Sequence, residues 1–249
     1  MVSALTERKL PIFLLHGRPA KQGDLSGSKS VRSVMPNIYF FEFGFRSPKR
    51  VSPIQIDGKL DDWSASNLVP DLMHLRGTRP FAHVYFSWDD DNLYIGLSVT
   101  GKRKPVDVDN VRYWRKDSLE LWFDFRNDKT RRRYSEHCHQ FILIPKGRKA
   151  NKELATAGEF SQLGGPIQET ILNYEEIEVA STVGQWEYSL EARFPRSVIP
   201  TYDPVNHPII GFNYHVNDDD RRRMQWWSCG PDFPRHADPG TWGSIDLIG

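Results

Sequence analysis

The sequence has too few cysteines for a disulfide framework. Only Cys138 and Cys229 occur among 249 residues, whereas small disulfide-built scaffolds carry several pairs. The sequence leaves open a single disulfide between these two cysteines, although two buried free thiols are the commoner outcome. The chain must therefore be stabilised mainly by a hydrophobic core, and it is long enough to build one.

Long apolar runs and an excess of one charge are also missing. No run approaches the roughly 18 apolar residues that a membrane-spanning helix needs. Thirty-three basic and 32 acidic residues leave a formal charge of +1, so no field of one sign directs the chain to nucleic acid or membrane. The apolar stretch at residues 12–15 is shorter than the roughly 7 to 15 residues of a signal-peptide core. We therefore expect the protein to bind neither nucleic acid nor membrane. We also expect a cytoplasmic location rather than a secreted one.

Recognisable catalytic motifs are absent as well. The sequence contains no glycine-rich phosphate loop, nucleophile elbow or HExxH zinc motif. Glu120 and Asp124 share one face of a predicted strand, but four residues of strand separate them by about 13 Å. Glycosidases hold their two carboxyl groups about 5 to 9.5 Å apart. The sequence leaves an enzyme open but does not support one.

What the chain does contain favours short strands. Seventeen prolines, 18 glycines and 12% aromatic residues are typical of all-β domains with irregular turns. The clearest strand starts at residue 118, where apolar and other side chains alternate strictly and predict one buried face. The predicted buried residues are Leu119, Leu121, Phe123 and Phe125, and the opposite face carries Ser118, Glu120, Trp122 and Asp124.

Further strands are predicted on both sides of this one. Residues 84–88 and 93–99 flank the turn at residues 89–92 and predict a hairpin. The acids of that turn are not spaced like an EF-hand loop, so we expect a solvated turn rather than a calcium site. Residues 146–168 have the composition of an insertion, with a short helix expected at residues 153–160.

Several of these segments resemble family 9 carbohydrate-binding modules. Residues 114–120, Trp-Arg-Lys-Asp-Ser-Leu-Glu, resemble the family's Trp-x-x-Asp-Ser-(aliphatic)-Glu signature. Residues 53–63 are similar to its opening Ile-Asp-Gly-x-(aliphatic)-Asp-x-x-Trp, and residues 84–99 to its second hairpin. Shorter matches follow in the family's order: Gln140-Phe141, Leu190-Glu191-Ala192, Ile210-Gly211-Phe212-Asn213, Val216-Asn217-Asp218, Asp238-Pro239 and Trp242-Gly243. The resemblance covers about residues 51–249.

The resemblance implies a non-catalytic, DOMON-like fold: an immunoglobulin-like antiparallel β-sandwich with irregular loops and one or two short helices. It implies that Trp114 is a sugar-stacking platform and that Glu120 accepts hydrogen bonds from sugar hydroxyls. The family's second platform tryptophan falls on His236, in a loop that also carries Phe233, and a sugar-contacting arginine falls on Ile142. The sugar site is therefore degenerate. Members of the family also bind calcium. The resemblance therefore implies calcium as a cofactor, but it assigns no calcium ligands in this sequence.

Domain organisation and function follow from these patterns. We expect residues 1–36 to be a disordered extension, with Met35 as an alternative start, and residues 37–249 to form the sandwich domain. The predicted function is non-catalytic sugar recognition by aromatic stacking and carboxylate hydrogen bonds. The alternative is a structural or protein-interaction module that has lost the sugar site. A metal-dependent enzyme using His137 and His139, which share a strand face, would need a third ligand.

Overall fold

The computed structural model describes residues 42–147, 151–160, 171–172, 175–221, 223–230 and 238–249. The expected disordered extension at residues 1–36 and the site residues Phe233 and His236 lie outside these ranges. In the described part of the chain, no helix has the length and apolar character needed to cross a bilayer.

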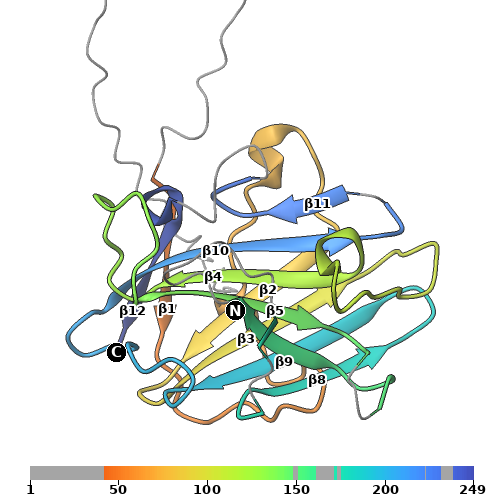
Figure 1. The fold of residues 1–249 in the computed structure, drawn as a ribbon, viewed down its shortest axis with the longest axis horizontal. Coiled ribbons are helices and arrows are strands. Elements are labelled where there is room, and N and C mark those ends of the chain that lie inside the picture. Colours follow the sequence, from red (N-terminus) through yellow and green to blue (C-terminus); the bar gives the residue numbers. More distant parts are fainter. Residues whose placement is uncertain (1–41, 148–150, 161–170, 173–174, 222, 231–237) are drawn as a thin grey trace, which may run out of the picture.

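Two β-sheets form the fold (Figure 1). The larger sheet contains β1 (Gly44–Pro48), β4 (Ser118–Asp124), β5 (Cys138–Ile144), β6 (Thr156–Phe160), β7 (Ile171–Leu172), β10 (Ile209–Asp218), β11 (Arg223–Trp226) and β12 (Gly243–Ile248). The smaller sheet contains β2 (Ala82–Trp88), β3 (Asn92–Val99), β8 (Glu178–Val183) and β9 (Tyr188–Pro195). The helical elements are single 3-10 turns: η2 (Ala65–Asn67), η3 (Met73–Arg76), η4 (Tyr113–Arg115) and η5 (Pro239–Thr241).

The long strand β10 organises the larger sheet. The strand order is β1-β12-β10-β4-β5-β6-β7, and β11 also pairs with β10. One edge of β10 pairs with β4, while its other edge pairs first with β12 and then with β11. β1 runs parallel to β12, and the other described pairs of this sheet are antiparallel. The predicted antiparallel sandwich is confirmed, with one parallel pair at its edge.

Aromatic rings from both sheets fill the space between them. Phe141 of β5 lies 4.7 Å from Phe194 of β9 between ring centroids, and Phe212 of β10 lies 5.9 Å from Phe86 of β2. Leu119, Leu121, Phe123 and Phe125 are all fully buried in this core, as their alternation predicts. Burying an aromatic or aliphatic side chain contributes about 1.5–3 kcal/mol, so these rings are the main stabilising contact between the sheets.

Two expectations from the sequence are wrong. The segment expected to form a helix at residues 153–160 contains β6, which pairs antiparallel with β5 because the backbone groups of that strand need partners. The face of β4 expected to meet solvent is buried too, since every residue of the strand is buried. The outward face of β4 is therefore a second, polar interior.

The opening motif at residues 53–63 is anchored to the outward face of the smaller sheet. Glu191 of β9 accepts hydrogen bonds from Trp63 Nε1 at 2.7 Å, Gly58 N at 2.8 Å and Asp57 N at 3.2 Å. Gly58 has φ +85°, and a Cβ there would lie 2.6 Å from the backbone of Ser181, so only glycine fits this turn. The Ile-Asp-Gly and Leu-Glu-Ala motifs of the sequence therefore meet as one structural contact.

Replacing Glu191 tests this contact. We expect Glu191→Gln to lower the free energy of unfolding by about 1–3 kcal/mol, because the amide nitrogen that replaces one carboxylate oxygen cannot accept a hydrogen bond. Glu178→Gln is the matched control, since Glu178 forms an exposed ion pair with Arg193 on the same sheet and such pairs contribute about 0–1 kcal/mol. Urea unfolding measures both variants, and equal losses would contradict the anchoring role.

Glu191 also predicts a pH dependence. Burial raises the pKa of this carboxyl above its usual 4.5, outweighing the hydrogen bonds from Trp63, Gly58 and Asp57 that lower it. The folded protein then holds this proton more tightly than the unfolded chain does, so stability from Glu191 is greatest at low pH. We expect the stability difference between wild type and Glu191→Gln to shrink as pH rises from about 4 through the folded pKa. A stability difference that grows with pH over this range would contradict a raised pKa of Glu191 in the folded protein.

Candidate functional site

Glu120 lies at the centre of the outward face of β4, held by side-chain amides from both neighbouring strands. Asn217 Nδ2 on β10 donates to Glu120 Oε1 at 2.8 Å, and Gln140 Nε2 on β5 donates to Oε2 at 3.3 Å. The Asn217 amide also donates to Ser118 Oγ at 3.0 Å. Glu120 is 1% exposed, and buried carboxylates require such donors. The two amides therefore fix the direction in which this carboxylate accepts hydrogen bonds.

The strand register places His215 and Ile142 on either side of Glu120. Glu120 pairs with His215 across the β4–β10 ladder and with Ile142 across the β4–β5 ladder. His215 Nε2 lies 2.8 Å from the Cys229 carbonyl oxygen, so this nitrogen carries a hydrogen and donates. Ile142 is fully buried and gives the carboxylate an apolar flank where the resemblance places an arginine.

Trp114 reaches the same face of the sheet from η4. It is half-buried, and its ring meets the Tyr113 ring edge-on with centroids 5.2 Å apart. Trp114 packs against the apolar cluster of Tyr113, Ile142 and Ile144. Because Ile142 is the cross-strand neighbour of Glu120, the structure brings an aromatic ring and a fixed carboxylate to one face.

The part of this face beyond Glu120 is closed by aromatic and sulfur-containing side chains. Trp122 clusters with Cys138, Cys229 and Trp242, and Tyr134 packs against them. The Trp122 ring lies 4.8 Å from the His215 ring, and the Tyr134 ring 5.6 Å from that of Trp242. This cluster covers the outward side of β4 and explains why the strand is buried on both faces.

An open hollow of about 340 Å³ lies at the Tyr134 end of the cluster. Its walls are Arg131, Arg132, Arg133 and Tyr134. Arg131 pairs with Asp128, and Arg132 with Asp238, in exposed ion pairs. Trp114 and Glu120 are not among the described residues that line this hollow.

The metal-enzyme hypothesis finds no third ligand in the ranges that the structure covers. No group of three or more His, Cys, Asp or Glu side chains there could hold a metal ion. His139 Nδ1 lies 2.6 Å from Glu159 Oε1, and its ring stacks on Phe141. His137 precedes β5, and its Nε2 lies 3.6 Å from Oε1 of its neighbour Glu136.

Neither the acidic turn at Asp89 nor the buried pair Asp117 and Asp218 fits a calcium site. Asp89 in the predicted acidic turn accepts hydrogen bonds from two backbone N–H groups of that turn and from the Tyr94 hydroxyl. The buried acids Asp117 and Asp218 share the ammonium of Lys102. Calcium takes six to eight oxygen ligands, whereas these carboxylates already accept hydrogen bonds from protein donors.

Comparison with known proteins identifies the family. A family model described as carbohydrate family 9 binding domain-like matches residues 56–249. The chain belongs to this family. Endo-1,4-beta-xylanase A of Thermotoga neapolitana is 26% identical over 206 residues, which is 78% of this chain and 17% of the xylanase. Exoglucanase XynX of Acetivibrio thermocellus is 26% identical over 223 residues, 85% of this chain and 18% of that enzyme. The chain thus spans less than a fifth of the length of these relatives.

Solved structures of the family share this fold. A family 9 carbohydrate-binding module from Caldicellulosiruptor kristjanssonii, in complex with cellotriose, superposes with a TM-score of 0.56 at 20% identity. The match covers 83% of this chain and 94% of the module. The same module in complex with glucose gives a TM-score of 0.55, also at 20% identity, over 82% and 96% of the two chains. The sandwich predicted from the resemblance is therefore confirmed.

The structure adds to the site three residues whose contacts around Glu120 the sequence does not predict. The roles of Gln140, Asn217 and His215 around Glu120 depend on which strands neighbour β4, and the pairing brings residues 97 positions apart into contact. The sequence signal that could have indicated Asn217 and His215 is the alternation of side chains along a strand, which places both residues on one face. Trp114 packs against the cluster that contains Ile142, the cross-strand neighbour of Glu120, whereas Phe233 and His236 lie outside the described residues.

The two cysteines of the cluster give a chemical test of this closed face. Cys138 and Cys229 are free and buried, and burial followed by the charge of Asp124 raises the pKa of Cys138 to about 11. We expect neither thiol of the native protein to react with Ellman's reagent at pH 8, because both are buried and Cys138 is also protonated at that pH. Two thiols should react once the protein is unfolded without reductant. Fast native labelling, or fewer than two thiols after unfolding, would contradict this arrangement.

Proposed function

We propose that the protein binds a carbohydrate at the outward face of β4. Glu120 accepts hydrogen bonds from sugar hydroxyls, and Trp114 stacks on the C–H face of the ring. The observation that carries this proposal is the Glu120 carboxylate, oriented by Asn217 and Gln140 on the face that Trp114 also reaches. Ligand sites combine a few fixed polar groups with apolar and aromatic walls, and a sugar presents both kinds of surface.

The second wall of the proposed site is assigned to His236 and Phe233. An imidazole offers less stacking area than an indole, and Ile142 provides no hydrogen bond where an arginine would. Both changes remove contacts from the ligand. We therefore expect binding weaker than a site with two tryptophans and an arginine would give.

Glucose-based and xylose-based oligosaccharides are the first ligands to test. The structurally similar module from Caldicellulosiruptor kristjanssonii was solved with cellotriose and with glucose. The curated relatives are a 1,4-beta-xylanase and an exoglucanase. This chain matches less than a fifth of each of those enzymes. That small share supports the proposal that the common part is a binding module without catalytic activity.

A second function, a structural or protein-interaction module, is favoured by one specific observation. Glu120 is only 1% exposed, so a sugar hydroxyl reaches it only if a neighbouring side chain moves. If that movement does not occur, the same polar face serves only to hold β4, β5 and β10 together. The two functions differ in whether any saccharide binds the folded protein.

Titration calorimetry with glucose, cellotriose and xylotriose tests the proposal on three proteins. We expect saturable binding to wild type, and Trp114→Ala to weaken it at least tenfold, which corresponds to about 1.4 kcal/mol. Trp186→Ala is the matched control. Trp186 is 49% exposed and lies in the turn between β8 and β9 of the other sheet, so its loss should leave the affinity unchanged.

Each alternative outcome has a distinct meaning. No heat change with any saccharide, from wild type shown to be folded, would favour the interaction module. Binding that is lost in Trp186→Ala but kept in Trp114→Ala would place the sugar on the other sheet.

A further inference from the structure

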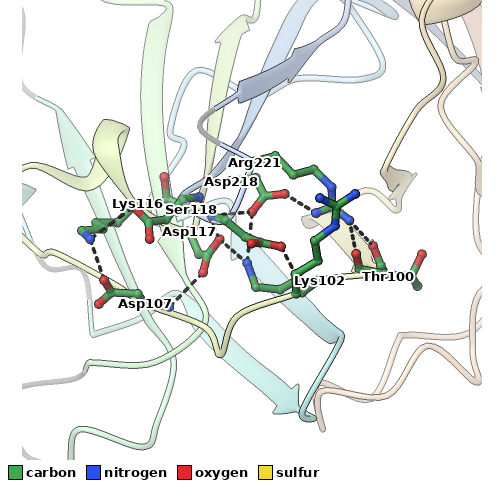
Figure 2. Close-up of polar contacts among 12 residues, drawn as sticks. Thr100, Lys102, Asp107, Lys116, Asp117, Ser118, Asp218 and Arg221 are labelled. Carbon is green, nitrogen blue, oxygen red and sulfur yellow. Dashed lines mark hydrogen bonds and ion pairs between the residues drawn. The ribbon is translucent and has the colours of Figure 1, made fainter.

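A buried ion network lies at the end of the sandwich where β4 begins and β10 ends. Lys102 points toward both Asp117 and Asp218 (Figure 2). Its Nζ is 2.8 Å from Asp117 Oδ1 and 3.1 Å from Asp218 Oδ1. The three side chains are 1%, 1% and 0% exposed, respectively. Arg221 binds the other oxygen of Asp218 and donates to the Thr100 carbonyl at 2.9 Å. We call these four ionic residues, Lys102, Asp117, Asp218 and Arg221, the Lys102 network.

A cation is required between the two acids of this network. Two buried carboxylates that approach one another repel strongly at low dielectric, and neither ionises easily without a positive charge nearby. Burial would favour the neutral amine of Lys102, but its hydrogen bonds and charge interactions with Asp117 and Asp218 outweigh burial and raise its pKa. The ammonium is therefore the charged form that the fold retains.

Protein donors occupy all four carboxylate oxygens of the two acids. Asp117 Oδ1 also accepts from Asp219 N at 3.3 Å, and its Oδ2 accepts from Asp107 N at 2.9 Å. Asp218 Oδ1 accepts from Asp220 N at 3.0 Å, and its Oδ2 accepts from Arg221. A divalent ion would have to displace Lys102 to bridge these oxygens. The donor set thus suits an ammonium, whose hydrogen bonds are about 2.7–2.9 Å long.

The Lys102 network is joined directly to the proposed sugar site. Asp117 stands midway between Trp114 and Glu120 in the sequence, where η4 passes into β4. Asp218 follows Asn217, whose amide donates to Glu120 at 2.8 Å. One ammonium therefore ties the segment between Trp114 and Glu120 to β10, the strand whose Asn217 donates to Glu120.

We propose that Lys102 is the built-in structural cation of the sugar site. Its ammonium takes the place of a divalent metal ion between Asp117 and Asp218, and it positions Trp114 and Glu120 without calcium. The positioning role rests on the proposed sugar binding, whereas the replacement of a metal ion stands on the network alone.

The test compares wild type, Lys102→Met, Lys102→Ala and Lys104→Met in EDTA and in millimolar calcium chloride. Lys102→Met keeps most of the stem without the charge, and Lys102→Ala opens the space between the carboxylates. Lys104 is an exposed lysine of the same loop and serves as the control. Thermal unfolding and saccharide affinity are measured for each protein.

We expect wild type and Lys104→Met to have the same melting temperature and the same affinity in both buffers. Lys102→Met should melt roughly 10 °C lower, because two buried acids then lie together without the ammonium between them, and should bind saccharide at least tenfold more weakly. Calcium should raise the melting temperature of Lys102→Ala, since the two carboxylates then have room for the ion.

A wild type that calcium stabilises, or whose affinity EDTA lowers, would overturn the proposal even if the Lys102 variants fail to fold. So would Lys102→Met with wild-type melting and affinity, or Lys102→Ala without a calcium response. If wild type binds no saccharide at all, the proposed function fails, and the melting temperatures still decide whether Lys102 replaces a metal ion.

Discussion

The hydrogen-bonding demand of one buried carboxylate, Glu120, determines the outward face of the larger sheet. A carboxylate removed from water is stable only if nearby groups donate to it. Its donors are Asn217 and Gln140, one from each strand that neighbours β4. The order β10-β4-β5 is therefore specified twice, by aromatic packing on the inner face and by polar pairing on the outer one. A slip of one residue in either ladder would break both at once.

The same constraint decides what a ligand must do at this site. A sugar hydroxyl that binds Glu120 replaces part of an existing hydrogen bond, so the net gain is the difference between two similar contacts. Affinity then depends on the area stacked on Trp114 and on how rigidly the two residues are held. Rigidity comes from the segment between them, where Lys102 joins Asp117 to Asp218. Preorganisation of this kind reduces the conformational entropy lost on binding.

The sequence predicts the inner half of this fold better than the outer half. Alternation identified Leu119, Leu121, Phe123 and Phe125 as core, because burial on one face leaves a period of two. Alternation could not show that the opposite face of β4 is also buried, because that burial depends on contacts with Cys229 and Trp242 near the end of the chain. Residues 153–160 were wrongly expected to be helical because the unpaired edge of β5, not local preference, makes them a strand. The motif match predicts Trp114 and Glu120 as residues of one site, but the partners of Glu120 could be identified only from the strand order.

Glu120 and Glu191 show why burial alone does not identify the functional acid. Each lies on the outward face of a strand, and they are 1% and 0% exposed. Glu191 accepts from two backbone N–H groups and from the indole of Trp63, and these donors are fixed by the turn that they close. Glu120 accepts from side-chain amides, which can rotate and carry a second hydrogen bond of their own. A ligand that replaced one of these side-chain donors would leave the backbone in place, whereas displacing the donors of Glu191 would open the turn. This difference supports Glu120 as the acid of the proposed sugar site and a structural role for Glu191 in the other sheet.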